Sequence, residues 1–239
     1  MVYEIFPLGD SALTIDFGNV ISLSINDRVR KLAEVLSRNS FKGLIEIVPA
    51  YSSLTIFYDP VKVRRAYADY QTAFAAVKNE AEKALAQAVN FVLETREKPL
   101  IGIPVCYDSD FALDLEFVAE SKKLTVEQVV KIHTERVYRV FMIGFLPGFP
   151  YLGEVDERLN VGRKPALRPI VPPGSVGLAG KQTGIYSLES PGGWQIVGKT
   201  PVSLFNPKSE SPALLQTGDR VRFYQIDRQT FDGFAFRNH

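Results

Sequence analysis

The chain has 239 residues, with 28 lysines and arginines against 27 aspartates and glutamates, so its formal net charge is +1. It lacks the basic excess that nucleic-acid-binding surfaces carry, which argues against a nucleic-acid partner. Charged residues interrupt the apolar segment 73–93, and no basic secretory n-region is visible, so neither a membrane span nor a signal peptide is expected. The single cysteine, Cys106, excludes an internal disulfide. We therefore expect a cytoplasmic protein.

The first half of the chain alternates the periodicities of strands and helices. The expected elements are a strand at 12–17, a helix at 25–36, strands at 43–48 and 54–58, a helix at 66–85 and a strand at 100–106. This order predicts a ferredoxin-like βαββαβ domain, placed at residues 1–95. The last of these strands could instead belong to the domain that follows.

The pattern changes in the second half, which we assign to residues 96–239. Two short helices are expected at 113–122 and 126–134, the second of which begins with a capping box. After residue 138, short strands alternate with glycine and proline turns, which predicts a closed or nearly closed β-barrel. The tail 232–239 is expected to fray. The fold class is therefore α+β.

Three phrases rich in glycine and proline follow one another in this second half. They cover residues 144–153, 172–186 and 190–201. Aromatic and branched residues stand between the glycines and need burial, whereas glycine permits tight bends and close backbone approach. The phrases therefore predict short strands that turn sharply around a pocket.

Familiar site motifs do not account for these phrases. Gly180-Lys181 resembles the end of a P-loop, but Ser175 stands where that motif needs glycine, and Gln182 replaces the hydroxyl that binds magnesium. Ser175 also lacks the spacing of a nucleophile elbow. His133 is the only histidine away from the C-terminus, so any Ser-His pair would join Ser175 to His133. We favour instead the interpretation that Ser175 is an ordinary serine of a tight turn. One internal histidine, one cysteine and no clustered carboxylates predict no metal site.

Together the phrases resemble the signature of the allophanate hydrolase subunit 1-like family. The resemblance extends to residues 132–134 and 215–221, and the N-terminal segments 9–13 and 47–51 also fit. It therefore covers nearly the whole chain. The resemblance implies a cyclophilin-like β-barrel in the second domain, where periodicity alone indicates only mostly β structure.

For function, the resemblance implies the B subunit of an ATP-dependent 5-oxoprolinase, which opens the lactam of 5-oxoproline (pyroglutamate) to give glutamate. Because the chain has no nucleotide motif of its own, ATP is expected to bind jointly with, or within, a partner subunit. The implied partners are the C subunit (KipA-like) and the A subunit (LamB/YcsF-like) of that enzyme. The chain alone is expected to be inactive.

Two other functions are considered. A KipI-like inhibitor of a sporulation histidine kinase would need an exposed patch, for which Phe145, Phe149 and Tyr151 are candidates, although core packing is the stronger interpretation for at least one of them. An allophanate hydrolase component is less favoured, because we find no Ser-Ser-Lys constellation of the amidase type.

The resemblance also guides the choice of catalytic candidates, which are His133, Arg168 and Gln182. The near-neutral pKa of histidine suits a proton shuttle at the substrate amide, with a cap at the helix C-terminus as the alternative for His133. Arg163 and Arg168 occupy arginine positions of the family, and a planar guanidinium suits a carboxylate or phosphoryl oxygen. Leu167 departs from the family pattern, which has proline before the second arginine.

The substrate-binding candidates lie in the same phrases and the segment that leads into them. They are Arg163, Ser175, Thr183, Tyr186 and Trp194. Turn hydrogen bonding is the ordinary alternative for the hydroxyl residues, and a place in the core is the ordinary alternative for the tryptophan.

Overall fold

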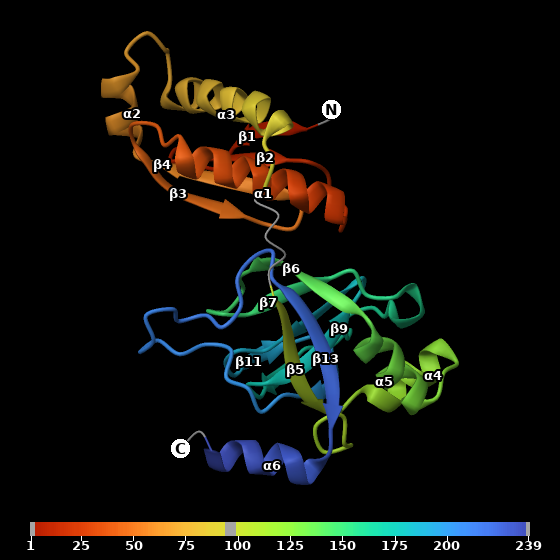
Figure 1. Cartoon of the computed structure of the whole chain (residues 1–239). Coiled ribbons are helices and arrows are strands. Elements are labelled where there is room, and N and C mark those ends of the chain that lie inside the picture. The colour runs from red at the N-terminus through yellow and green to blue at the C-terminus, as the bar shows by residue number, and fades with distance from the viewer. Residues whose placement is uncertain (1–2, 94–98, 238–239) are drawn as a thin grey trace. The chain divides into compact units, whose positions relative to one another are not determined.

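The computed structural model describes residues 3–93 and 99–237. The chain divides into two compact units, Met1–Arg96 and Glu97–His239 (Figure 1). Among the described residues, no helix combines the length and the apolar character that crossing a bilayer requires.

The N-terminal unit is an antiparallel sheet with helices packed against it. Its elements are β1 (Glu4–Pro7), β2 (Ala12–Asp16), α1 (Leu23–Arg38), β3 (Leu44–Pro49), β4 (Ser53–Tyr58), α2 (Pro60–Ala66) and α3 (Ala73–Asn90). The strand order is β1-β2-β4-β3. Leu13 and Ile56 from the sheet and Leu32 and Val77 from the helices are fully buried in one core. This burial of apolar faces against one another is what stabilises the unit.

This unit differs from its predicted order in two places. Strand β1 was not predicted and pairs with β2 at the edge of the sheet, whereas the strand expected at 100–106 belongs to the other unit. The helix expected at 66–85 begins only at Ala73, as α3, because Thr72 accepts a hydrogen bond from Ala75 N and so caps its start. The short helix α2, which shares only Ala66 with the expected range, was not predicted, and a break separates it from α3. The helical spacing of apolar residues continues across this break, which hid it from the sequence pattern.

The second unit is built around a closed barrel. Its elements are β5 (Leu100–Cys106), α4 (Leu115–Lys122), α5 (Val126–Glu135), β6 (Val137–Ile143), β7 (Pro150–Gly153), the 3-10 helix η1 (Glu157–Leu159), β8 (Arg168–Val171), β9 (Ser175–Ala179), β10 (Gln182–Ile185), β11 (Ser190–Gly192), β12 (Gln195–Lys199), β13 (Arg220–Ile226) and α6 (Arg228–Arg237). The barrel order is β10-β7-β6-β13-β5-β12-β9, closed by the β9–β10 pairing, and β8 and β11 pair separately. The predicted closed barrel is confirmed.

Residues on neighbouring positions of the barrel strands enter two different apolar clusters. Leu178 and Val197 belong to the main core of the unit, which also takes in residues of α4 and α5. Ala179 and Ile196, one residue away, belong to a second cluster with aromatic residues and with Val171 of β8. Because successive side chains of a strand point to opposite faces, the same strands supply both clusters. Helix α5 begins with the predicted capping box, formed by Thr125 and Gln128.

The C-terminal segment forms a helix instead of the frayed tail expected at 232–239. Asp227 accepts a hydrogen bond from Thr230 N at 2.7 Å and so starts α6. Phe231 is buried against Phe111, with ring centroids 4.4 Å apart, and Arg228 forms an ion pair with Asp110. These contacts tie α6 to the segment that follows β5 (Figure 1). Residues 238–239 lie outside the described part of the chain.

Candidate functional site

Two of the predicted site residues, His133 and Thr183, meet in the core of the barrel unit. His133 Nε2 lies 3.0 Å from Thr183 Oγ1, and His133 Nδ1 lies 2.8 Å from the hydroxyl of Tyr107. Thr183 Oγ1 donates its hydrogen to the carbonyl of Gly177 at 3.0 Å. The threonine oxygen must therefore accept from Nε2–H, so Nδ1 is unprotonated and accepts from Tyr107. These bonds define one neutral tautomer of the histidine.

His133 is fully buried, and its ring stacks on Phe223 with centroids 4.6 Å apart. Burial lowers the pKa of His133 to about 3. Its side chain does not cap the end of α5, where the hydroxyl of Tyr138 donates to the His133 carbonyl. Both nitrogens are occupied and no part of the ring is exposed, so in this structure the imidazole joins α5 to the barrel wall and does not reach a substrate.

Arg168 is held by an ion pair with a residue that the sequence analysis did not single out. Its two terminal nitrogens each donate to one carboxylate oxygen of Asp114 at 2.7 Å. Asp114 also accepts from Lys164 Nζ at 2.9 Å and from the backbone N of Ile196 at 2.7 Å. Burial raises the pKa of Asp114, but these hydrogen bonds outweigh burial and the net pKa is lowered. Arg168 therefore stabilises the structure and is not free to bind a ligand carboxylate.

Arg163 lies in the same segment as Lys164 and Arg168, but its side chain is exposed to solvent. The carbonyl of Gly162 accepts from Gln195 Nε2 at 3.0 Å, and Lys164 N donates to the carbonyl of Gly193 at 2.7 Å. The backbone on each side of Arg163 is thus fastened to the segment around Trp194. Arg163 itself is exposed and has no acidic partner among the described residues. It is therefore a positioned cation without a counter-ion in that part of the chain.

A group of aromatic side chains, which we call the outer aromatic cluster, lies beside Arg163. It consists of Phe145, Phe149, Tyr151, Tyr186 and Trp194. The ring of Phe149 lies at its centre, 4.8 to 5.6 Å from the ring centroids of its three buried or half-buried neighbours. Burial raises the pKa of Tyr151 and of Tyr186, and the charge of Arg163 opposes both shifts. The guanidinium is therefore close enough to act electrostatically on both hydroxyls.

The members of this cluster differ in exposure. Phe149, Tyr186 and Trp194 are buried, so the core role considered for the tryptophan is confirmed, although its ring also forms part of the cluster. Phe145 is 61% exposed and has a positive φ of 68°, a conformation that costs energy for a residue with a side chain. Phe145 is therefore the aromatic residue of the cluster most open to a partner.

Gln182 and Ser175 are buried at the barrel wall. Gln182 lies opposite Ala179 in the β9–β10 ladder, and directly opposite side chains share one face of a sheet. Ala179 belongs to the second apolar cluster, which also contains Phe149, Tyr186 and Trp194, so Gln182 faces the same side as these aromatic residues. Its Nε2 is buried without a hydrogen-bond partner in the described residues. Such a donor suits a ligand oxygen. Ser175 pairs across the barrel wall with Lys199.

Gly180-Lys181 does not form a nucleotide-binding loop. These two residues turn the chain between β9 and β10, with Gly180 at a φ of 59°, whereas a P-loop leads from a strand into a helix. Lys181 Nζ lies 3.2 Å from a carboxylate oxygen of Glu157. The residues present here therefore do not fit a nucleotide phosphate.

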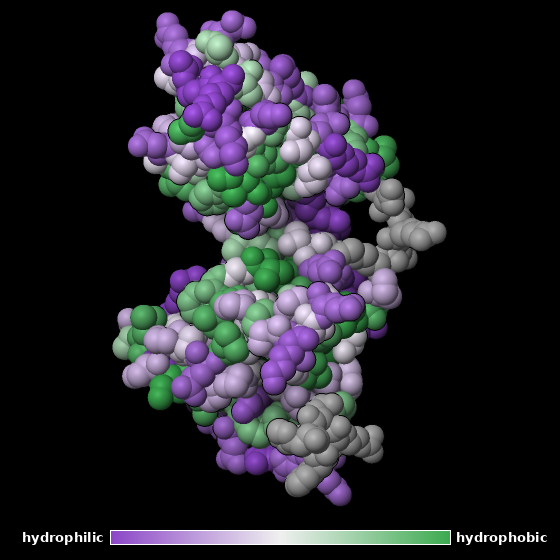
Figure 2. All heavy atoms as spheres, turned by 90° about the vertical axis from the view of Figure 1, so that its left-hand side faces the viewer, coloured by the Kyte–Doolittle hydropathy of each residue, from purple (hydrophilic) through white to green (hydrophobic). Residues whose placement is uncertain are grey.

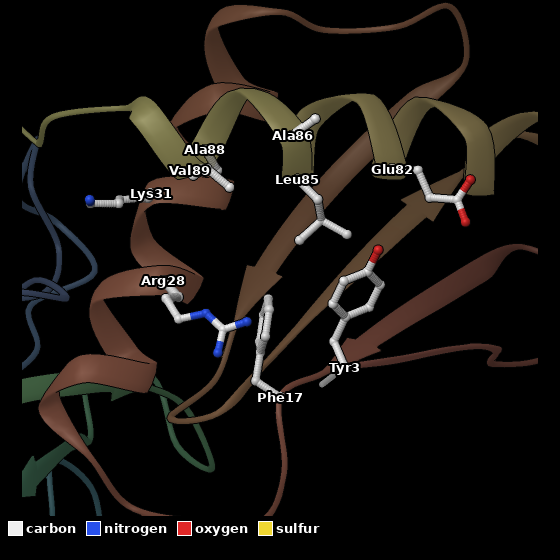
Figure 3. A pocket seen from close by; sticks show the side chains of 9 residues that line it. All are labelled: Tyr3, Phe17, Arg28, Lys31, Glu82, Leu85, Ala86, Ala88 and Val89. Atoms are coloured by element: carbon white, nitrogen blue, oxygen red, sulfur yellow. The ribbon is translucent and has the colours of Figure 1, made fainter. Parts of the chain in front are cut away.

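The N-terminal unit has a groove that the sequence analysis did not indicate (Figure 3). Its volume is about 530 Å³, and it is lined by residues of α1 and α3 together with Tyr3 and Phe17. The guanidinium of Arg28 lies over the ring of Phe17, 4.6 Å from the centroid. No predicted site residue lines this groove.

Comparison with known proteins identifies the family of the chain. The sequence pattern of the carboxyltransferase domain, subdomain C and D, matches residues 3–215, and the chain belongs to this family. The chain is 42% identical over 234 residues to the B subunit of 5-oxoprolinase from Bacillus subtilis, covering 97% of this chain and 96% of that protein. The B subunit of 5-oxoprolinase from Haemophilus influenzae is 35% identical over 220 residues, covering 92% of this chain and 96% of that protein.

Among solved structures, the protein TTHA0988 superimposes with a TM-score of 0.74 at 38% identity. The match covers 90% of this chain but only 40% of that protein. A fold like this one is therefore also found as part of a longer chain.

Proposed function

We propose that this chain is the B subunit of an ATP-dependent 5-oxoprolinase and acts in the opening of 5-oxoproline to glutamate. The observation that carries the proposal is the identity of 42% over nearly the full length of a protein with that name. The local geometry supports it, because the outer aromatic cluster, Arg163 and Gln182 together offer an aromatic wall, a guanidinium and an unpaired amide donor.

The chemistry of a lactam explains why these groups are useful. A lactam is a poor electrophile, and phosphorylation of its amide oxygen by ATP makes ring opening accessible. Arg163 would bind either the substrate carboxylate or the oxygen on which negative charge develops, with Gln182 Nε2 as a second donor. Arg168 acts indirectly, as a positioning residue that holds the loop carrying Arg163 through Asp114. His133 supports the barrel wall behind Thr183.

ATP and the remaining catalytic groups would come from partner subunits. We propose that the C subunit (KipA-like) completes the site and that the A subunit (LamB/YcsF-like) completes hydrolysis. Two large hydrophobic side chains are exposed at or near the outer aromatic cluster. Phe145, a member of the cluster, is 61% exposed, and Leu167 is 66% exposed. Leu167 lies against Gly193, next to Trp194 of the cluster. Figure 2 shows hydrophobic patches on the face of the molecule that it draws. Exposed apolar groups of this kind favour a protein partner.

The proposal is tested by ATP-dependent release of glutamate from 5-oxoproline. The chain is assayed alone, with the KipA-like partner, and with both partners. We expect activity only in the full mixture. No activity in a mixture in which the complex has formed would overturn the proposal, and a block of autophosphorylation of a sporulation histidine kinase would then be the next activity to measure.

Replacing Arg163 by alanine is expected to reduce activity of the full mixture by about 100-fold, the order expected for loss of one donor to a developing oxyanion. Lysine at this position should restore only part of the activity, because a point charge cannot donate two parallel hydrogen bonds. The matched control is Arg158→Ala, since Arg158 is an exposed arginine paired with Asp156. Equal activity of the two alanine variants would remove Arg163 from the site.

Replacing Phe145 by serine is expected to weaken binding of the KipA-like partner by at least about tenfold, as for an aromatic anchor at an interface. The exposed ring contributes little to the core, so the fold of the isolated chain should be retained. Leu214→Ser is the control, because Leu214 is also exposed, at 46%, in the same unit. Titration calorimetry with the KipA-like partner measures both variants, and unchanged affinity for Phe145→Ser would place the interface elsewhere.

A further inference from the structure

A pocket of about 300 Å³ opens beside the turn at Gly174 and has no role in the function proposed above. Its wall is formed by this turn, by Lys199 and Thr200 at the end of β12, and by Phe231 of α6. Gly174 has a φ of 83°, and a Cβ at this position would collide with the carbonyl oxygen of Thr200. The shape of the pocket therefore depends on glycine at this position.

Three hydrogen-bond donors of the pocket lack an acceptor among the residues that the structure describes. Ser187 is 8% exposed, lines the pocket, and its Oγ has no hydrogen-bond partner among the described residues. Thr200 Oγ1 accepts from Val202 N at 3.2 Å, which leaves its own hydrogen available. Lys199 forms no ion pair within the described residues. Ser187 and Thr200 are buried, where donors without acceptors are rare in native proteins, whereas Lys199 is partly exposed. Together the three donors fit a ligand that only accepts.

The charge around the pocket is positive. The stem of Lys199 runs past Gly174, and its Nζ lies 5.4 Å from the ring centroid of Phe111. Burial and then the charge of Arg228 lower the pKa of Lys199. The nearby carboxylates of Asp110 and Asp232 pair with Arg228 and leave the ammonium of Lys199 without a counter-ion in the described part of the chain.

We propose that this pocket binds a small oxyanion, a carboxylate or a phosphate, with Lys199, Ser187 and Thr200 as its hydrogen-bond donors. An anion would supply the missing acceptors and neutralise the lysine. Leu204 and Phe231 give the pocket apolar walls, which suit a compact apolar body attached to the anionic group. The proposal concerns binding by this chain alone, so it stands or falls independently of the 5-oxoprolinase activity.

The test is a titration of the isotope-labelled full-length chain, without its partners, followed by NMR. The probes are sodium phosphate and 5-oxoproline, each at constant ionic strength set by chloride. We expect saturable shifts of the backbone amides of Gly174, Ser187 and Thr200, and a rise in the pKa of Lys199 on binding. A preference for phosphate would indicate a phosphate-bearing ligand, and a preference for 5-oxoproline would indicate a carboxylate on a small ring.

Lys199→Gln and Ser187→Ala are each expected to weaken binding by about tenfold or more, the scale of one charge-assisted hydrogen bond. Lys199→Arg keeps the charge and should retain part of the affinity, which separates loss of charge from loss of fold. The control is Lys131→Gln, because Lys131 is an exposed lysine paired with Glu135 on α5. Shifts that do not saturate, or that are equal in the Lys199→Gln and Lys131→Gln variants, would overturn the proposal.

Discussion

Replacement of Asp114 by alanine is expected to lower the free energy of unfolding of the barrel unit by about 3 kcal/mol. The carboxylate is 4% exposed and serves Arg168, Lys164 and the backbone N of Ile196 at once. Its removal leaves two cations and a buried N–H without their acceptor. The expected loss lies at the lower end of the range for broken buried pairs, because the side chains of Arg168 and Lys164 are 22% and 29% exposed and water can partly solvate them.

The loss is measured by urea unfolding followed by the fluorescence of Trp194, which is the only tryptophan of the chain and belongs to the barrel unit. Glu135→Gln is the control, since it removes an exposed ion pair of the same unit and should cost no more than about 0.5 kcal/mol. The loss of free energy of unfolding in Asp114→Asn should lie between the losses in Asp114→Ala and Glu135→Gln, because an amide oxygen can still accept from Ile196 N. A value for Asp114→Ala no larger than that of the control would contradict the network described here.

The Asp114 network also shows why part of the site was not predictable. Arg168 was chosen from the sequence as a catalytic candidate, and its local pattern is the same whether it binds a substrate or a carboxylate of its own chain. Its partner lies 54 residues earlier in the sequence, and nothing local links the two. Lys164 reaches the same carboxylate across 50 residues. Arg163, from the same short segment, is exposed, whereas the other two cations are held by Asp114.

Elements with a local signal were predicted well. Helix α5 has a capping box, and the glycine and proline turns mark the short strands of the barrel. Elements defined by distant partners were not. Strand β5 is parallel to β13, which lies far along the chain at Arg220–Ile226, so its place in the barrel was left open by the sequence. Helix α6 depends on the contact of Phe231 with Phe111, which periodicity does not reveal.

Loss of stability on mild acidification is the second large effect that we expect, and its origin is His133. The folded chain holds this imidazole neutral, with a pKa of about 3, whereas an unfolded histidine titrates near 6.5. Between these values the unfolded state binds one proton more than the folded state, so the free energy of unfolding falls as pH is lowered. The contribution of His133 is complete above pH 6.5 and decreases below it. Between pH 7.5 and pH 5 the expected loss is about 2 kcal/mol.

The window from pH 7.5 to pH 5 separates His133 from the acidic groups, because hydrogen bonding and nearby cations keep the pKa values of Asp114 and Asp156 below their usual range. Unfolding is again followed by the fluorescence of Trp194. We call the change of the free energy of unfolding with pH in this window the slope. In His133→Phe the slope should disappear, although the variant is less stable at every pH because Tyr107 and Thr183 lose a hydrogen-bond partner.

His239→Gln removes the only other histidine of the chain and should keep the full slope. If instead the slope survives in His133→Phe, His133 is not the titrating group, and the buried neutral tautomer is wrong. If His133→Phe also retains activity in the full enzyme mixture, the imidazole has no part in the chemistry and serves only the barrel wall. Loss of the slope together with loss of activity at unchanged assembly would mean that Thr183, to which the imidazole donates, must be held in place for catalysis.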